Sequence, residues 1–106
     1  MDDVVKAIAE PRRREILRLV RGGELTAGAI AAHFEITRPA VSQHLKVLKD
    51  ARLLDERRDG ARRLYRARPE GLAGLRDFLE ELWRESLQRL KFEAEKEERR
   101  TRADAN

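Results

Sequence analysis

The sequence has no cysteine, and only 5% of its 106 residues are aromatic. Without cysteine the chain forms no disulfide and no thiolate metal site. No apolar run approaches the ~20 residues that a membrane-spanning helix needs, and the first residues, Met1-Asp2-Asp3, do not resemble a secretion signal. We therefore expect a cytoplasmic protein with an aliphatic core and no membrane partner.

The inventory of groups for catalysis is also poor. The chain lacks a cysteine nucleophile and a glycine-rich phosphate loop, and its two histidines, His33 and His44, have no evident partners for a catalytic triad. We expect no enzymatic activity and no cofactor.

Positive charge is abundant but concentrated in one segment. Residues 1–51 carry nine basic and seven acidic groups, residues 52–68 carry seven and three, and residues 69–106 carry eight and ten. The segment 52–68 thus holds a net charge of +4, which equals the net charge of the whole chain. A local arginine cluster is typical of phosphate binding, although arginine-rich surfaces are also common as solvated faces.

The length fits one domain, which we expect over residues 1–98, followed by a charged tail without regular structure over residues 99–106. The apolar spacing predicts a short first helix with Val4, Val5 and Ile8 on one face. A second helix is predicted from Pro11 to about Arg21, ended by Gly22-Gly23, with the arginines at positions 12–14 outside.

The next segment predicts a helix-turn-helix. Thr26 is a suitable N-cap for a short helix that ends near Phe34, and Thr37 is a suitable N-cap for a further helix from Arg38 to Ala51. Pro39 is tolerated in the first turn of that helix, because first-turn N–H groups have no partner within a helix.

The helix from Arg38 to Ala51 has two distinct faces. Its buried stripe is predicted to be Val41, Leu45 and Leu48, with His44 on the flank. The opposite face presents Pro39, Ser42, Gln43 and Lys46. An ordinary solvated helix usually mixes glutamate and lysine there, whereas hydroxyl, amide and ammonium groups suit base edges and phosphates.

A β-hairpin follows, with strands predicted at Leu53–Arg57 and Arg62–Ala67 around the turn Arg58-Asp59-Gly60-Ala61. After a helix-turn-helix such a hairpin is a wing. We expect Arg58, Arg62 and Arg63, at or beside its tip, to meet a flanking phosphate or the minor groove. The alternative is an edge hairpin that its charges keep soluble.

The last helix is predicted from Glu70 to about Glu98, and it carries more apolar surface than a small domain covers. A second copy of the chain is the natural cover, pairing this helix with its mate and with the first helix. The residues expected at this dimer interface are Val4, Val5, Ile8, Leu72, Leu75, Leu79, Leu82, Trp83 and Leu90.

Three strings of residues resemble the ArsR family of winged helix-turn-helix repressors. They are the segment from Glu10 to Leu17 (EPRRREIL), the segment from Arg38 to Leu48 (RPAVSQHLKVL), and the Asp59-Gly60 wing followed by Leu64-Tyr65. The resemblance covers residues 3–92. It implies a mainly α-helical winged helix-turn-helix with a small β-hairpin, in the order α-α-α-α-β-β-α, that dimerises through its terminal helices and represses transcription.

Two departures from the family pattern bear on function. Thr26, Ala27 and Gly28 stand where metal-sensing members carry paired cysteines, and both histidines lie in the helix-turn-helix instead of the last helix. The chain is therefore similar to the branch of the family without a metal site. The second departure is Arg52, where the family usually has glycine; a left-handed helix cap at Arg52 should cost ~1 kcal/mol.

We therefore expect a homodimeric regulator that places two recognition helices in successive major grooves of an inverted repeat in duplex DNA. RNA is disfavoured because the major groove of A-form RNA is too narrow for a helix. A protein-interaction module would have no need for the polar helix face together with an arginine-tipped wing. No feature of the sequence indicates a particular small-molecule effector. The expected DNA-binding residues are Thr37, Arg38, Pro39, Ser42, Gln43, His44, Lys46, Arg58, Arg62 and Arg63.

Overall fold

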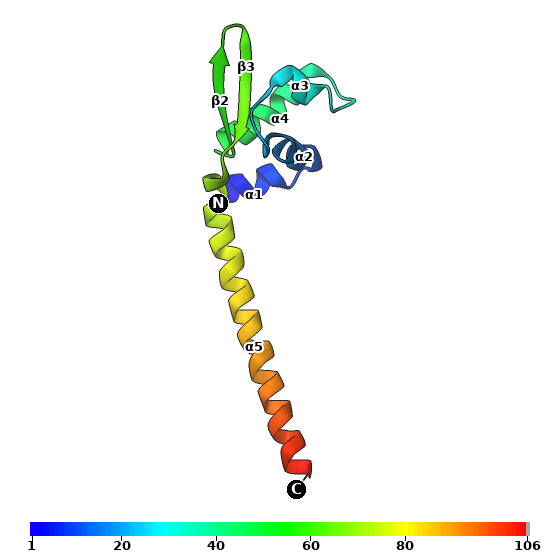
Figure 1. Ribbon diagram of the computed structural model, residues 1–106, viewed down its shortest axis with the longest axis vertical. Helices are drawn as coiled ribbons and strands as arrows, with labels where there is room; N and C mark the ends of the chain where they lie inside the picture. The colour runs from blue at the N-terminus through cyan, green and yellow to red at the C-terminus, as the bar shows by residue number, and fades with distance from the viewer. Residues whose placement is uncertain (106) are drawn as a thin grey trace. The chain divides into compact units, whose positions relative to one another are not determined.

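The computed structural model describes residues 1–105 and divides the chain into two compact units, Met1–Leu75 and the chain from Arg76 onward. The first unit begins with three helices and a short strand, and continues with the longest of its helices, a hairpin and a 3₁₀ turn (Figure 1). The elements are α1 (Asp2–Ile8), α2 (Pro11–Val20), β1 (Leu25–Thr26), α3 (Ala27–Ala31), α4 (Arg38–Asp50), β2 (Leu54–Asp59), β3 (Arg62–Ala67), η1 (Pro69–Leu72) and α5 (Ala73–Ala105).

Polar side chains and proline set the helix starts, as the sequence predicted. Pro11 is the first residue of α2, and the carboxylate of Glu10 accepts a hydrogen bond from the backbone N–H of Arg13. Thr26 caps α3 through the N–H of Ala29 at 3.0 Å, and Thr37 caps α4 through the N–H of Ala40 at 3.2 Å. The two N-cap predictions, at Thr26 and Thr37, are therefore confirmed.

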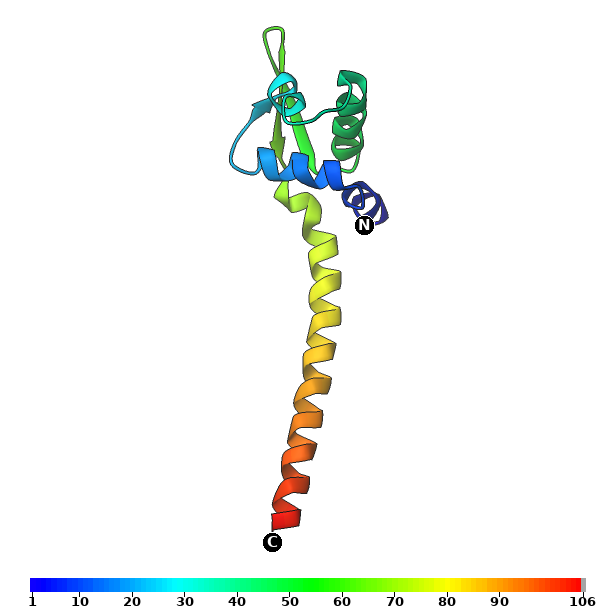
Figure 2. The same ribbon diagram turned by 90° about the vertical axis from the view of Figure 1, so that its right-hand side faces the viewer.

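The core of the first unit is aliphatic. Ile16 of α2, Ile30 of α3 and Leu48 of α4 are fully buried, and Leu53 and Leu54 pack beside them. Each side chain comes from the apolar stripe of its own element, so burying the stripes against one another brings α2, α3 and α4 together. Figure 2 shows the β2–β3 hairpin extending beyond these helices to its turn.

The sheet has three antiparallel strands in the order β1-β3-β2, one more than the sequence predicted. β1 has only two residues, too few for an alternating pattern, and it pairs Leu25 with Tyr65 of β3. The predicted turn was also wrong by two residues at its start, because Arg58 and Asp59 both belong to β2. Asp59 pairs with Arg62, so the turn is Gly60-Ala61, with φ of +63° at Gly60. A positive φ at only the first central residue is the pattern of a type II′ turn, which favours glycine there.

The end of α4 confirms the expected left-handed cap at Arg52, whose φ is +61°. The N–H of Arg52 donates to the carbonyl of Lys49 at 3.0 Å, and the N–H of Leu53 donates to the carbonyl of Leu48 at 2.9 Å. These two bonds and the burial of Leu48 and Leu53 form a Schellman motif. Gly71 packs against this cap so closely that a Cβ there would overlap the carbonyl oxygen of Arg52.

α5 begins after the 3₁₀ turn, three residues later than predicted, and continues through Ala105. The sequence predicted a tail without regular structure over residues 99–106, but residues 99–105 are helical. Asn106 lies outside the described residues. Ion pairs one turn apart, Arg100 with Glu97 and Arg102 with Glu98, each at 2.6 Å, support a helix that has no apolar stripe there. Within residues 1–105 no helix is long and apolar enough to span a membrane.

Candidate nucleic-acid interface

The two faces of α4 are arranged as the sequence predicted. Val41, Leu45 and Leu48 are buried, whereas Ser42, Gln43 and Lys46 are exposed. Thr37, Arg38 and Pro39 are exposed at the N-terminus of the helix. The chain thus presents a row of hydroxyl, amide and ammonium groups on a rigid element.

Val47 is a residue that the sequence analysis missed. It lies one turn after Gln43 on α4 and is 39% exposed. An aliphatic side chain on this face suits the methyl group of thymine. Its position between the apolar and polar faces of the helix was the available signal.

Three of the arginines expected to bind DNA come together in one groove. Arg38 from the start of α4 lines it together with Arg62 and Arg63 of the wing, and the start of α3 closes it, in a space of about 370 Å³. Gly28 lies on the wall of this groove, where a Cβ would be in ordinary van der Waals contact with Nη1 of Arg38 at 3.5 Å. The involvement of residues 26–28, where β1 ends and α3 begins, could not be recognised from the sequence, since only the fold brings them beside the wing.

The wing has an excess of positive charge near its tip. Arg58 of β2 and Arg63 of β3 are directly opposite each other in the register. Like charges at opposite positions repel each other and destabilise the strand pair. Arg62 pairs with Asp59 at 2.9 Å, and Arg63 with Glu56 at 3.5 Å. The exposed Arg58 has no ion pair within the described residues. An anion bound beside Arg58 and Arg63 would relieve their repulsion.

The base of the wing is tied to α4 and to the segment before β1. Lys49 pairs with Glu56 at 2.9 Å, and this hydrogen bond raises the pKa of Lys49. Arg57 makes a two-point contact with Glu24, with Nε and Nη2 at 2.7 and 3.0 Å from the carboxylate oxygens. The hydrogen bond from Arg57 lowers the pKa of Glu24. These pairs fix the direction in which the wing leaves the helices.

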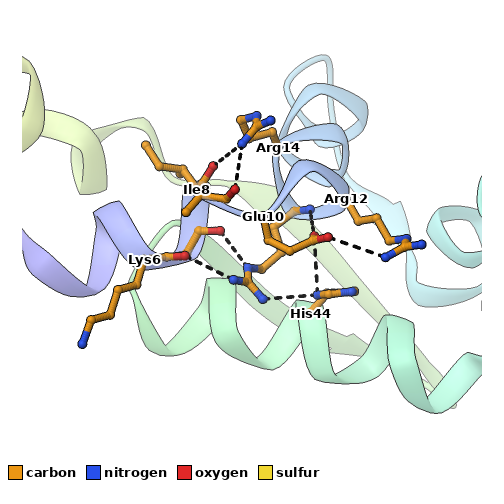
Figure 3. Close-up of polar contacts among 9 residues, drawn as sticks. Lys6, Ile8, Glu10, Arg12, Arg14 and His44 are labelled. Atoms are coloured by element: carbon orange, nitrogen blue, oxygen red, sulfur yellow. Dashed lines mark hydrogen bonds and ion pairs between the residues drawn. The ribbon is translucent and has the colours of Figure 1, made fainter.

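His44 and Arg13 differ from their expected places. The side chain of His44 is only 17% exposed, and its Nδ1 lies 3.4 Å from Nη1 of Arg13 and 4.0 Å from a carboxylate oxygen of Glu10 (Figure 3). Arg13 was predicted to lie outside with its neighbours. Instead its guanidinium is partly buried and donates to carbonyls of α1, while Arg12 and Arg14 are exposed. Periodicity alone did not separate Arg13 from Arg12 and Arg14.

The residues expected at a dimer interface fall into two groups. Three of them are on α1, and two of these, Val4 and Ile8, pack into the core of the first unit. The third, Val5, is 43% exposed and is available to contact a second copy. Leu75 also packs partly against that core. The remaining members of the set are exposed on η1 and α5, namely Leu72, Leu79, Leu82, Trp83 and Leu90.

Comparison with known proteins agrees with this arrangement. A family model described as bacterial regulatory protein, arsR family, matches residues 10–56. The HTH-type transcriptional regulator Rv2034 of Mycobacterium tuberculosis is 45% identical over 86 residues, which is 81% of this chain and 80% of the relative. The transcriptional repressor SdpR of Bacillus subtilis is 50% identical over 60 residues, which is 57% of this chain and 67% of the relative.

A solved structure gives the same fold. It is the homodimeric winged helix-turn-helix DNA-binding domain Mb0332 from Mycobacterium bovis, described as a possible ArsR-family transcriptional regulator. It superposes with a TM-score of 0.63 at 34% identity, covering 79% of this chain and 78% of that one. The chain therefore belongs to the ArsR family, and it is a DNA-binding transcriptional regulator with a winged helix-turn-helix and not an enzyme.

Proposed function

We propose that the chain acts as a homodimeric repressor that inserts two α4 helices into successive major grooves of an inverted-repeat operator. The observation that carries the proposal is the position of the exposed polar face of α4 on the same compact unit as the groove lined by Arg38, Arg62 and Arg63. Repression is supported by the relative SdpR, a transcriptional repressor.

The residue types indicate separate roles. Gln43 and Ser42 have the donors and acceptors that read base edges, and Val47 suits a thymine methyl group. Lys46, Thr37 and Pro39 lie beside them and would meet the sugar-phosphate backbone, which contributes affinity and register but little sequence information. His44 contributes differently, because its ring is turned toward α2.

The groove defined by Arg38, Arg62 and Arg63 fits a backbone phosphate. Guanidinium groups bind phosphate with two parallel hydrogen bonds, and a groove with several of them favours an anion. A phosphate there would be held from both the start of α4 and the wing. Arg58 would then contact a further phosphate beyond the turn.

Dimerisation is supported by the exposed apolar residues of α5 and by the homodimeric state of the Mb0332 domain. α5 has 33 residues, which at the usual helical rise is about 50 Å. Trp83 is 66% exposed and Leu90 is 64% exposed, values that a second copy would reduce. The exposed large apolar residues of α5 lie between Phe78 and Phe92, and such a stripe is typical of an interaction surface.

A bacterial-type regulator binds its operator in the cytoplasm, so we expect this chain there. We also expect no dependence on a metal ion. Within residues 1–105 no three histidine or acidic side chains lie together in a way that would hold one.

Selection from a random duplex library tests the proposal directly. The full-length chain is mixed with the library at fixed salt, and the bound duplexes are sequenced after several rounds. We expect an inverted repeat whose half-sites are separated by about one helical turn, 10–10.5 base pairs. Recovery of a single unrepeated site, or of no preferred sequence, would contradict the proposal.

A further inference from the structure

The guanidinium of Arg13 on α2 makes polar contacts with both α1 and α4. Its Nε donates to the carbonyl of Ala7 at 2.7 Å, and its Nη2 donates to the carbonyl of Lys6 at 3.2 Å. Its Nη1 lies 3.4 Å from Nδ1 of His44 on α4. Each side-chain nitrogen of Arg13 therefore faces an acceptor. Two of these acceptors are on α1, and the third is on α4, the DNA-reading helix.

Glu10 also contacts Arg13. One carboxylate oxygen accepts the N–H of Arg13 at 3.1 Å, and the other lies 3.6 Å from Nη1 of Arg12. Desolvation acts to raise the pKa of Glu10, but the hydrogen bond from the backbone of Arg13 and the nearby positive charges lower it overall. The carboxylate is thus held ionised beside Arg13. At 4.0 Å it is too far from Nδ1 of His44 for a hydrogen bond.

The chemistry of the guanidinium decides the state of the ring. Arginine has donors only, so Nδ1 of His44 must be the acceptor of the pair. An accepting Nδ1 puts the single proton of the neutral imidazole on Nε2. A proton on Nδ1 would remove the acceptor and leave two donors facing each other 3.4 Å apart.

We propose that Arg13 is a positioning residue that couples α1 to the DNA-reading helix through its hydrogen bond to Nδ1 of His44, which leaves the proton of the ring on Nε2. The consequence rests on the proposed function, in which the chain dimerises and α4 enters the major groove; Val5 is the exposed apolar residue through which α1 would meet the second copy. A displacement of α1 on dimerisation moves the two carbonyls that hold Arg13. The same guanidinium then passes the displacement to His44, one residue after Gln43 on α4.

Arg14 provides a matched control. Its Nη1 donates to the carbonyls of Ile8 and Ala9 at 2.8 and 3.1 Å, so it also anchors the C-terminal end of α1. Both hydrogen bonds found for its side chain within residues 1–105 end there. Arg14→Ala removes two hydrogen bonds to α1 without touching His44, whereas Arg13→Ala removes the link to α4 as well.

The first measurement needs no DNA. The chain has two histidines, and ¹⁵N NMR of their side chains reports the tautomer of each, with the exposed His33 as the internal reference. We expect the wild type and Arg14→Ala to show His44 with its proton on Nε2, and Arg13→Ala to show a mixture of tautomers. A wild-type His44 with its proton on Nδ1, or an unchanged His44 in a folded Arg13→Ala variant, would overturn the proposal.

Substitutions of His44 test the contact between Arg13 and His44 from the side of α4. They also decide whether this contact couples α1 to α4 if Arg13→Ala does not fold. Asparagine keeps an acceptor near the place of Nδ1, and leucine does not. The backbone amide signals of Lys6 and Ala7 should therefore shift in His44→Leu and remain in place in His44→Asn. Equal shifts in both variants, or none in either, would contradict coupling through this acceptor.

A DNA measurement separates failure of the coupling from failure of the proposed function. On the selected duplex we expect Arg13→Ala and His44→Leu to bind about tenfold more weakly, the effect of one charge-assisted hydrogen bond. Arg14→Ala should bind within about twofold of the wild type. If the wild type itself selects no duplex, the proposed function fails while the NMR result still decides the coupling. If Arg14→Ala weakens binding as much as Arg13→Ala, the role of Arg13 is only to anchor α1.

Discussion

Replacing Arg52 with glycine should stabilise the protein, because Arg52 has a backbone conformation that favours glycine. Its φ is +61°, within the left-handed cap of α4. The left-handed conformation costs an L-residue about 1–2 kcal/mol, and glycine loses about 0.5–1 kcal/mol through its greater freedom in the unfolded chain. The net gain expected for Arg52→Gly is therefore about 0.5–1 kcal/mol. The two backbone hydrogen bonds of the cap remain, since neither involves a side chain.

The assay is thermal unfolding followed by circular dichroism, at one fixed protein concentration because a dimer's Tm depends on concentration. For a unit of this size the gain corresponds to a rise in Tm of about 2–8 °C. Arg52→Ala is the control, because it removes the side chain but keeps the Cβ that causes the strain. The reasoning is refuted if Arg52→Gly is no more stable than Arg52→Ala.

Three further predictions address assembly, metal ions and pH. Changing both Leu79 and Leu82 to aspartate should produce a monomer, because it places charges on the exposed stripe of α5, and sedimentation velocity would show it; a wild type that sediments as a monomer at micromolar concentration contradicts the interface. Affinity for the selected duplex should not change with zinc, arsenite or a chelator, and tight stoichiometric zinc binding that releases DNA would contradict this. The pKa of Glu24 is lowered by its hydrogen bond from Arg57, so the pair stabilises the fold above the ordinary value of 4.5 and ceases to do so as the pH falls through the lower folded value. Glu24→Gln should therefore reduce the loss of stability in acid, measured by denaturant unfolding at several pH values, and an unchanged acid profile would show that the pair contributes nothing.

Local signals predicted most of the fold. The caps at Thr26 and Thr37, Pro11 at the start of α2 and the buried stripe of α4 depend on short-range rules that a single sequence contains. The left-handed conformation of Arg52 was indicated instead by the family resemblance, which places glycine at this position. The Asp-Gly pair predicted the hairpin but not its register, because cross-strand pairing decided that Asp59 belongs to β2.

The candidate site could be predicted only where one element carries it. Ser42, Gln43 and Lys46 share a face of α4, so periodicity identified them. The groove beside Gly28 and the link from Arg13 to His44 join residues that are far apart along the chain, and only the folded arrangement brings them together. Val4 shows the opposite error, since an apolar residue on a short helix fits a core as well as an interface, and the structure places it in the core.

The central claim is that α4 reads base edges while the wing contacts phosphates, and one binding comparison tests it most directly. Affinities for the selected duplex and for a random duplex are measured at matched salt for the wild type, Gln43→Ala, and the double change of Arg62 and Arg63 to alanine. Gln43→Ala should cost ~1–3 kcal/mol on the selected duplex and little on the random one. The wing variant should weaken both equally and reduce the salt dependence by roughly one unit for each lost phosphate contact. If Gln43→Ala keeps the full preference while the wing variant abolishes it, the account is contradicted, because specificity then comes from minor-groove shape read by the arginines.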